Sequence, residues 1–353
     1  MTIAQKARVA VAMSGGVDSS VTAALLSSQG YDVFGITMRV APMTGQQAID
    51  DAVLVAGRLG IAHHVVDLST PFRESVLNPF VADYRAGRTP NPCARCNPLI
   101  KFGLLLDAAV ALGADSMATG HYARIQRAED GSCRLLKGVD AAKDQSYFLF
   151  GLRQEQLARV LFPLGGMTKT AVRTLAAELG LPVMEKAESQ EICFIPDNDY
   201  VRFLEEEEGV PTLAGNIVTR QGELLGRHRG IHCYTVGQRR GLGIAFREPL
   251  YVLGVDPCRQ EVIVGTRSEL FRSGLRAGGF NWILPQALPR PATCKIRYRH
   301  HPVSCELSDN GDGRVLILFH APEKGVTPGQ AVVAYDGETV LGGGWIEEAL
   351  EEC

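Results

Sequence analysis

The stretch MSGGVDSS at residues 13–20 decides the fold of the first part of the chain. An apolar run at residues 9–12 precedes it, and a helix-like stretch at residues 21–30 follows. A strand, a glycine turn and a helix in this order aim backbone N–H groups and the positive end of a helix dipole at one place, which suits a phosphate group. The stretch matches neither G-x-x-x-x-G-K-S/T nor G-x-G-x-x-G. A tight turn capped by Ser14 or Asp18 is the alternative interpretation.

From residue 9 to about residue 119, short apolar runs alternate with amphipathic stretches. This alternation predicts βαβ units around a parallel sheet. The expected strands are 9–13, 33–37, 64–68 and 116–118, and the expected helices are 19–29, 48–59, 71–84, 98–112 and 169–179. Gly30, Gly60, Gly113 and Gly180 follow four of these helices as expected C-terminal caps.

After about residue 203 the sequence changes to short β-prone runs broken by glycine and proline. Such runs are typical of small β domains or a barrel. We therefore expect an α/β protein with an N-terminal, doubly wound, Rossmann-like parallel-sheet domain, followed by two small β-rich domains, of which the last is a β-barrel. The expected domains are residues 1–205, 206–275 and 276–353.

Composition narrows the class of protein. No apolar stretch approaches the roughly 20 residues that cross a bilayer, and the first residues lack a signal-peptide pattern, so we expect a soluble, cytoplasmic protein without a membrane partner. Nine scattered cysteines fit a reducing compartment better than a disulfide framework. Because the formal net charge is −3, contact with nucleic acid has to use local basic patches, for which residues 220–247 and 295–301 are candidates. Solvated strand faces are the alternative for both patches.

Cys93 and Cys96 form a C-x-x-C pattern in TPNPCARCNPLIKFG, residues 89–103. Asn97 is expected to cap the helix that follows, which would place both thiols near a helix N-terminus and lower their pKa. A third candidate thiol is Cys193, in ESQEICFIPD at residues 188–197. A metal half-site or a structural cysteine pair remains the alternative for the C-x-x-C pattern.

The glycine turn resembles the S-G-G-x-D-S motif of the PP-loop ATP pyrophosphatases, and a series of motifs resembles the family of bacterial tRNA-specific 2-thiouridylases. These motifs, in chain order, are MSGGVDSS, N-P-x-x-x-C-N, ATGHY, KDQSYF, SQEICFI, T-x-G-Q-R-x-G-L-G, KIRYR, V-T-P-G-Q-A-V-V-x-Y and LGGGWI. The resemblance implies an ATP-dependent tRNA-uridine 2-sulfurtransferase. Such an enzyme adenylates the C2 oxygen of wobble uridine 34 in the tRNAs for Lys, Glu and Gln. It then transfers a cysteine-persulfide sulfur to give 2-thiouridine and releases AMP and pyrophosphate.

The same resemblance implies site residues. Cys193 would carry the persulfide, and Cys96 would be the nucleophile that helps to release sulfur and can form a disulfide with Cys193. Mg²⁺ would lie on the side of Asp18. The implied ATP-binding residues are Ala12, Met13, Ser14, Gly15, Gly16, Val17, Asp18, Ser19, Met38 and Gly120. The implied contacts to the target base are Asn91, Pro92 and Cys93. The implied tRNA contacts are His121, Lys143, Asp144, Gln145, Arg297, Tyr298 and Gln330. The implied partners are the tRNA anticodon arm and a cysteine desulfurase or sulfur-relay protein, with no role for DNA.

One position departs from the family pattern N-P-D-x-x-C, in which the Asp is expected to act as acid or base. Here that position is Cys93, and a thiol with an unperturbed pKa of about 8.5 does not simply replace a carboxyl group with one of about 3.9. Cys93, Cys96 and Cys193 could instead hold a 4Fe–4S cluster as the sulfur carrier, or zinc, which supplies no sulfur. Two other functions remain as alternatives: a PP-loop synthetase that adenylates a small metabolite, and a non-catalytic RNA-binding protein with a zinc-stapled loop.

Overall fold

A computed structural model describes residues 6–40, 46–186, 192–195 and 197–351. The chain divides into two compact units. The first unit comprises residues 1–76, 93–196 and 338–340, and the second comprises residues 77–92, 197–337 and 341–353.

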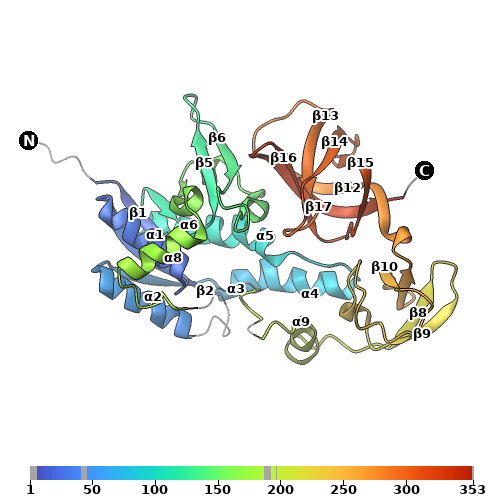
Figure 1. The fold of residues 1–353 in the computed structure, drawn as a ribbon. Coiled ribbons are helices and arrows are strands. Elements are labelled where there is room, and N and C mark those ends of the chain that lie inside the picture. The colour runs from blue at the N-terminus through green and yellow to red at the C-terminus, as the bar shows by residue number, and fades with distance from the viewer. Residues whose placement is uncertain (1–5, 41–45, 187–191, 196, 352–353) are drawn as a thin grey trace, which may run out of the picture. The chain divides into compact units, whose positions relative to one another are not determined.

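The first unit is built on a five-stranded sheet with the order β3-β2-β1-β4-β7, in which every neighbouring pair is parallel (Figure 1). Its strands are β1 (Arg8–Ala12), β2 (Asp32–Arg39), β3 (His63–Asp67), β4 (Ser116–Ala118) and β7 (Val160–Leu161). The strand order reverses at β1, which makes the carboxyl ends of β1 and β4 the switch point where ligands bind in open α/β sheets. The predicted parallel sheet is confirmed, although the first and third strands each begin and end one residue earlier than expected and the second is longer at both ends.

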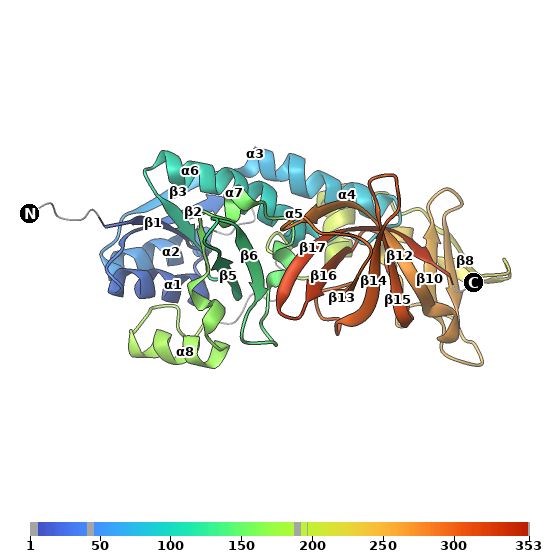
Figure 2. The ribbon, with the colours of Figure 1, turned by 90° about the horizontal axis from the view of Figure 1, so that it is seen from above.

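Helices lie on both faces of this sheet. Those of the first unit are α1 (Val17–Ser28), α2 (Gln46–Leu59), α3 (Ser69–Phe72), α5 (Pro92–Cys96, from Cys93 on), α6 (Leu105–Ala111), α7 (Gln154–Leu157) and α8 (Lys169–Glu178). Seen from above, α1 and α2 lie on one side of the strands and α6 on the other (Figure 2), as right-handed crossovers require. The four expected glycine caps are confirmed, because each has a positive φ, from 58° at Gly180 to 91° at Gly113.

Two expected helices differ from the prediction. The expected helix 71–84 is α3, a π-helical segment at Arg73–Leu77 and α4 (Asn78–Arg85), and α4 belongs to the second unit. The expected helix 98–112 begins earlier, at α5, and continues through a π-helical segment at Asn97–Leu104 into α6. Pro98 has no N–H to complete a regular helical turn, which accounts for the irregular segment after it.

The core of the first unit follows from its sequence. The middle residues of β1 and most of β2 are buried, as expected for parallel strands covered on both faces. Val9, Val11 and Val33 pack with Leu26 of α1 and Val55 of α2. An antiparallel hairpin, β5 (Ala123–Arg127) and β6 (Cys133–Lys137), also belongs to this unit.

The second unit contains two β structures. A four-stranded sheet has the order β10-β11-β8-β9, with β8 (Gly215–Thr219), β9 (Leu224–His228), β10 (Tyr251–Asp256) and β11 (Glu261–Gly265). Before it come α9 (Tyr200–Arg202) and a π-helical turn, η5 (Phe203–Glu207), and a 3₁₀ turn, η6 (Ile231–Cys233), follows β9.

The predicted C-terminal barrel is confirmed. Its strands follow the order β12-β15-β14-β13-β16-β17, and β17 pairs back with β12 to close it. They are β12 (Phe271–Trp282), β13 (Arg290–Lys295), β14 (Val303–Asp309), β15 (Val315–Lys324), β16 (Ala331–Asp336) and β17 (Thr339–Leu350). Leu275, Ile296, Leu307 and Val332 are among the buried side chains that fill it. Among the described helices of the chain, none is both long and apolar enough to cross a membrane.

Candidate functional site

The glycine turn joins β1 directly to α1. The N-cap of α1 is Gly16, so the alternative of a helix capped by Ser14 or Asp18 is wrong. The Ser19 hydroxyl instead accepts from the Ser14 N–H at 3.2 Å and donates to the Gly16 carbonyl at 3.1 Å, which fixes the loop from inside. Gly15 has a φ of +68°, and a Cβ there would collide with the Ala48 carbonyl of α2. Only glycine fits at this position, and the first-turn N–H groups of α1 keep the arrangement that suits a phosphate.

Asp18 faces a buried lysine that the sequence analysis missed. Lys169 Nζ lies 2.7 Å and 2.8 Å from the two carboxylate oxygens of Asp18, and the Tyr122 hydroxyl donates to Oδ1 at 2.8 Å. Lys169 is 8% exposed and is the first residue of α8, directly after its N-cap Thr168. The two residues of this ion pair are 151 residues apart in the sequence, and no local sequence motif predicts their contact. An ammonium group therefore lies on the side of Asp18 where Mg²⁺ is expected.

A second lysine contacts the loop itself. Lys186 Nζ donates to the Gly15 carbonyl at 3.1 Å and to Asp51 Oδ2 at 2.5 Å. The hydrogen bond from Lys186 to Asp51, with one from Gln47, lowers the pKa of Asp51. Lys169 and Lys186 thus place two ammonium groups at the glycine turn, each paired with a carboxylate, Asp18 and Asp51 respectively.

The other expected ATP-binding residues lie at neighbouring strand ends. Ala12 ends β1, Met38 lies near the end of β2, and Gly120 follows β4. Gly120 packs directly on the turn, since a Cβ there would lie 2.8 Å from the Asp18 carbonyl carbon and 2.9 Å from the Ser19 nitrogen. The structure thus brings the ends of β1 and β4 together at the switch point of the sheet.

The three candidate thiols differ in their exposure to solvent. Cys96 is buried, Cys93 is half-buried and Cys193 is exposed at its surface. Burial raises the pKa of Cys93 to about 11 and that of Cys96 to about 12, and the pKa of Cys193 is also raised, mainly by desolvation. The expected lowering of the thiol pKa is therefore wrong for Cys93 and Cys96.

The reason lies in the local helix. It begins at Pro92 rather than after Cys96, and Asn97 does not cap it. The Asn97 amide is buried and donates instead to the Phe148 carbonyl at 3.0 Å. Cys96 therefore lies inside the helical run, and the loss of solvation of its thiolate exceeds any benefit from the helix dipole.

Lys101 is a further residue that the sequence analysis missed. It lies one π-helical turn after Cys96, and its positive charge acts on Cys93, Cys96 and Cys193, in each case lowering the pKa. It also acts on His121, directly after Gly120, whose pKa is lowered by burial and then by Lys101. The thiols and the loop after β4 are therefore neighbours of one cation within the first unit.

Among the described residues, three metal-binding donor atoms lie within 4.8 Å of one another only at Glu205, His232 and Cys233. Cys93, Cys96 and Cys193 therefore lack the close spacing of a single zinc ion bound by three thiolates. We assign no role to a 4Fe–4S cluster. Every cysteine in the described part of the chain is a free thiol, so the expected pairing of Cys96 with Cys193 is not formed.

The expected RNA contacts of the first unit differ in their burial and in their hydrogen bonds within the protein. His121 bonds Thr119 at 2.7 Å and packs against the rings of Phe102 and Phe162. Asp144 is buried, and its carboxylate accepts from the N–H groups of Gly138 and Ser146. The described contacts of His121 and Asp144 are all made within the protein and stabilise the fold of the first unit. The contact of these two residues with RNA stays a prediction. Gln145 accepts from the Tyr122 N–H, and Lys143 is half-buried.

The remaining expected contacts belong to the second unit, apart from Cys93. Gln330 donates to the carbonyls of Thr89 and Pro90, both at 3.1 Å, and so holds the segment that leads to Asn91 and Pro92. Arg297 is exposed and Tyr298 half-buried, with Lys295 Nζ 5.5 Å from the Tyr298 ring centre.

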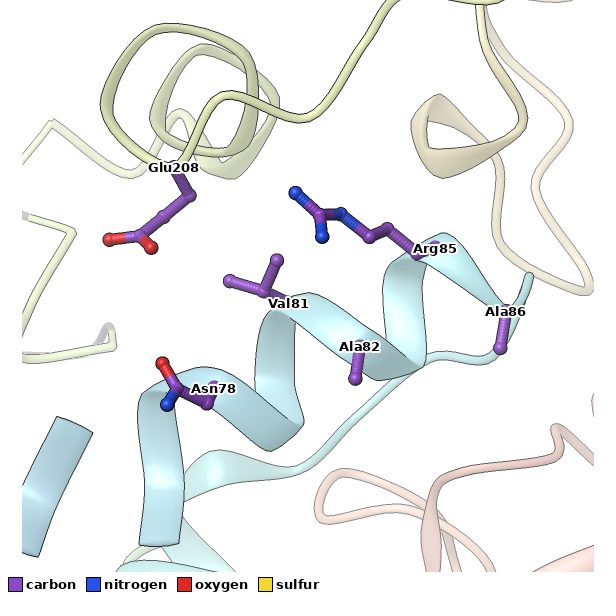
Figure 3. A pocket seen from close by; sticks show the side chains of 6 residues that line it. All are labelled: Asn78, Val81, Ala82, Arg85, Ala86 and Glu208. Atoms are coloured by element: carbon purple, nitrogen blue, oxygen red, sulfur yellow. The ribbon is translucent and has the colours of Figure 1, made fainter. Parts of the chain in front are cut away.

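A pocket of the second unit contains none of the expected site residues. It is lined by Asn78, Val81, Ala82, Arg85, Ala86 and Glu208. Val81 and Arg85 point from α4 toward the segment that carries Glu208 (Figure 3). No other observation connects this pocket with the thiols or with the glycine turn.

A parallel α/β sheet with an S-G-G-V-D-S turn at its switch point defines a nucleotide-binding protein of the PP-loop class. The family model described as "tRNA methyl transferase HUP domain" matches residues 7–197. The models described as "tRNA methyl transferase PRC-barrel domain" and "Aminomethyltransferase beta-barrel domain" match residues 202–266 and 272–346. The chain belongs to the family of tRNA-specific 2-thiouridylases, MnmA, as the relatives with that name demonstrate.

Two of these relatives come from Geotalea uraniireducens and Geobacter metallireducens. The first is 58% identical over 361 residues, covering 98% of this chain and 96% of that protein. The second is 56% identical over 367 residues, covering 100% of both. Among solved structures, a 4-thiouridine synthetase–RNA complex with bound ATP is similar with a TM-score of 0.36 and 17% identity, covering 57% of this chain and 50% of that one.

Proposed function

We propose that this chain is a tRNA-uridine 2-sulfurtransferase, which uses ATP to replace the C2 oxygen of uridine 34 by sulfur. The full-length relatives carry the name of this activity, and the glycine turn supplies the nucleotide site. The observation that carries the proposal is the position of Lys101, whose charge acts both on the thiols and on His121 beside the loop that packs on the turn. Activation and sulfur transfer can then occur on one substrate without its release.

The first step is adenylation. The uridine C2 oxygen attacks the α-phosphorus of ATP, a new O–P bond forms and pyrophosphate leaves. The N–H groups of the glycine turn, together with Lys169 and Lys186, hold the negative charge that develops on the leaving group. Asp18, whose carboxylate Lys169 and Tyr122 orient, would help to hold Mg²⁺, which would neutralise charge on the phosphates.

The second step is sulfur transfer. A persulfide on Cys193 attacks C2, and AMP leaves with the former C2 oxygen. The Cys96 thiolate then attacks Cys193 Sγ, which breaks the S–S bond, leaves the sulfur on C2 and forms a Cys96–Cys193 disulfide. A thiol reductant restores both cysteines. The proposal includes a desulfurase or sulfur-relay protein that loads Cys193, the tRNA anticodon arm as substrate and the cytoplasm as the place of action.

The proposal extends to the domains. We propose an ATP-binding catalytic domain at residues 1–205, a central tRNA-binding β domain at residues 206–275 and a C-terminal barrel at residues 276–353. The first boundary is supported by the change near residue 203 from amphipathic, helix-like stretches to short β-prone runs broken by glycine and proline. Arg297 is exposed, and a positively charged, exposed side chain suits a phosphate contact.

Reconstitution tests the function. Untagged protein is incubated with ATP, tRNA transcript, a cysteine desulfurase, cysteine and a thiol reductant, and the tRNA nucleosides are analysed by mass spectrometry. We expect 2-thiouridine together with tRNA-dependent release of AMP and pyrophosphate. Adenylation of a small metabolite without tRNA would favour the synthetase alternative, and tRNA binding without AMP release would favour the non-catalytic one.

Replacement of Gly120 by alanine is expected to weaken ATP use. The new Cβ would lie 2.8–2.9 Å from backbone atoms of Asp18 and Ser19, so the turn has to move. A displacement of this order at a reacting group costs up to about 100-fold in rate, and we expect kcat/KM for ATP to fall at least roughly tenfold. Pyrophosphate release measures it. Gly166→Ala, where nothing lies within 4 Å of the added Cβ, is the matched control. Equal activities of the two variants would contradict the prediction.

Lys101→Gln is expected to slow the thiol chemistry. Lys101 lowers the pKa of Cys96, which burial has raised to about 12. Loss of the charge raises this pKa further, so a smaller fraction of the thiol is ionised at any pH below it, and alkylation and sulfur transfer slow down. The alkylation rate of Cys96 is followed by peptide mass spectrometry from pH 7 to about 10. Its pH profile should move to higher pH, and at a fixed pH the rate should fall roughly tenfold for each unit by which the pKa rises.

Lys101→Arg keeps the charge and should restore most of the rate. An unchanged alkylation profile in Lys101→Gln would remove Lys101 from the mechanism. Unchanged ATP affinity in both variants is expected, and it shows that the nucleotide site is intact.

A further inference from the structure

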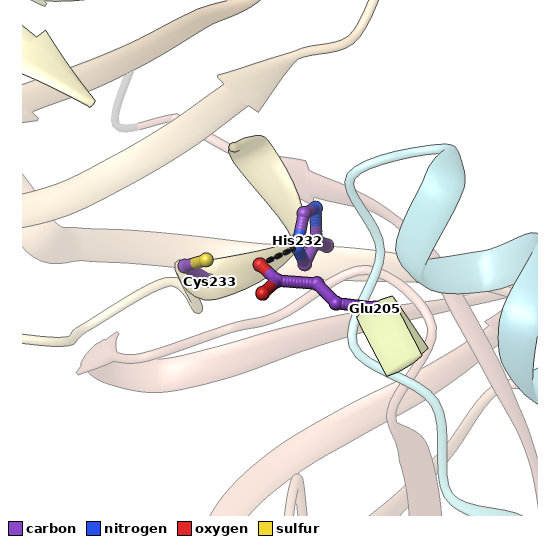
Figure 4. Close-up of side chains that lie close together, drawn as sticks. All are labelled: Glu205, His232 and Cys233. Atoms are coloured by element: carbon purple, nitrogen blue, oxygen red, sulfur yellow. Dashed lines mark hydrogen bonds and ion pairs between the residues drawn. The ribbon is translucent and has the colours of Figure 1, made fainter. Parts of the chain in front are cut away.

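A cluster of three metal-binding side chains lies in the second unit, among residues that the proposed reaction does not use. Glu205 comes from η5, and His232 and Cys233 come from η6. One donor atom from each, a carboxylate oxygen, an imidazole nitrogen and the thiol sulfur, lies within 4.8 Å of the other two. Figure 4 shows the Cys233 sulfur and the His232 ring on the two sides of the Glu205 carboxylate. His232 is 3% exposed and the Glu205 side chain 22%.

The contacts of the cluster hold it in place. His232 Nε2 donates to Glu205 Oε1 at 2.9 Å. The Arg229 side chain donates to the Cys233 sulfur, and Asp199 is close enough to act on both groups of that pair. The donors are thus oriented by neighbours, as the ligands of metal sites are.

We propose that Glu205, His232 and Cys233 bind Zn²⁺, with water as the fourth ligand. Sulfur, nitrogen and oxygen donors in one set suit zinc, whereas Mg²⁺ and Ca²⁺ prefer oxygen alone. Binding sends the thiol proton of Cys233 to solvent. His232 stays a neutral imidazole whose proton moves from Nε2 to Nδ1, so that Nε2 can bind the metal, and no oxidation state changes. The carboxylate and the thiolate neutralise the two charges of Zn²⁺, so the neighbouring Arg229 keeps its hydrogen bond to the sulfur.

The site has a structural consequence. Its ligands come from two segments about 27 residues apart in sequence, the helical turn before the four-stranded sheet and the 3₁₀ turn after β9. Metal bound to both fixes the helical turn to the sheet. The proposal does not depend on the sulfurtransferase activity, since none of the three residues is among those assigned to it.

Metal content tests the proposal. Untagged, full-length protein is freed of metal with a chelator, titrated with Zn²⁺ in equilibrium dialysis and analysed by mass spectrometry. We expect about one equivalent per chain, and Co²⁺ in its place should give a thiolate-to-cobalt charge-transfer band. Cys233→Ser should abolish the band and weaken zinc binding by more than roughly 100-fold, beyond the loss from an outer neighbour. His232→Gln should weaken it similarly.

The matched control is Cys258→Ser, which removes an exposed thiol of the same unit and should leave binding unchanged. Zinc should raise the Tm of the wild-type chain and of Cys258→Ser but not that of Cys233→Ser, because a ligand stabilises only the form that binds it. Circular dichroism checks that each variant is folded. If Cys233→Ser does not fold, Glu205→Gln, which keeps the size of the side chain, takes its place and should weaken binding.

Three results would overturn the proposal. One is the absence of stoichiometric zinc in the wild-type chain. Another is wild-type affinity in folded Cys233→Ser, His232→Gln or Glu205→Gln. The third is loss of zinc in Cys93→Ser or Cys193→Ser with no loss in Cys233→Ser, which would assign the metal to the thiols of the first unit.

Discussion

Cys193→Ser and Cys96→Ser are each expected to abolish the formation of 2-thiouridine while tRNA binding stays within about twofold of wild type. A serine oxygen cannot carry a persulfide in place of Cys193, and in place of Cys96 it cannot attack a sulfur–sulfur bond, because the thiolate is the nucleophile in this exchange. Mass spectrometry of tRNA nucleosides measures the product, and a filter-binding titration at fixed salt measures the affinity for tRNA.

The two variants should differ in what accumulates. Cys193→Ser should take up no persulfide from the desulfurase, whereas Cys96→Ser should be loaded at Cys193 and keep the sulfur. Cys133→Ser is the matched control, because Cys133 is buried in the same unit but takes no part in the reaction. Sustained turnover by Cys96→Ser would refute the disulfide-forming step. Weakened tRNA binding would point to a structural role for the thiols.

Cys93→Ser separates this mechanism from one that needs three thiolates. In the persulfide mechanism Cys93 neither carries nor receives sulfur, so its hydroxyl replacement should keep most of the activity. Cys93, Cys96 and Cys193 are not among the described donor atoms that lie within 4.8 Å of one another, which argues against a zinc ion held by the three thiols. Complete loss of sulfur transfer in a folded Cys93→Ser variant, with AMP release intact, would give Cys93 a chemical role.

Local sequence signals predicted the fold well. The apolar runs at β1, β2 and β4 and the glycines after α1, α2, α6 and α8 each act within a few residues, so they can be interpreted without the rest of the chain. The closed barrel followed from the same kind of signal, short β-prone runs between glycine and proline. The π-helical segment after Cys96 was missed, because Pro98 was interpreted as the start of a helix rather than as an irregularity inside one.

The candidate site was predicted less completely. The glycine turn is a local motif, but Lys169 and Lys186 reach it from 151 and 171 residues away. The pKa of Cys96 was predicted in the wrong direction because helix position can be inferred from sequence and burial cannot. The Glu205–His232 hydrogen bond likewise joins two segments whose contact only the folded chain shows.

Loss of the Asp18 carboxylate is expected to block adenylation. Asp18→Ala removes the partner of Lys169, whose side chain is 11% exposed, while that of Asp18 is 33% exposed. An unpaired buried cation costs about 3 kcal/mol, the lower end of the range for buried pairs because Asp18 is partly solvated. The variant should therefore release no pyrophosphate with tRNA and ATP and should also unfold at a lower temperature. These two effects have to be separated.

The double variant Asp18→Ala with Lys169→Met separates them. It removes both charges, and the apolar stem of methionine fills the space of the lysine, so most of the lost stability should return. Adenylation should not return, because the ammonium that holds the leaving pyrophosphate and the carboxylate that orients it are both gone. Thermal unfolding measures the first effect, and pyrophosphate release measures the second. A stable double variant that adenylates tRNA at the wild-type rate would reduce the pair to a structural contact, because the chemistry would then need neither charge.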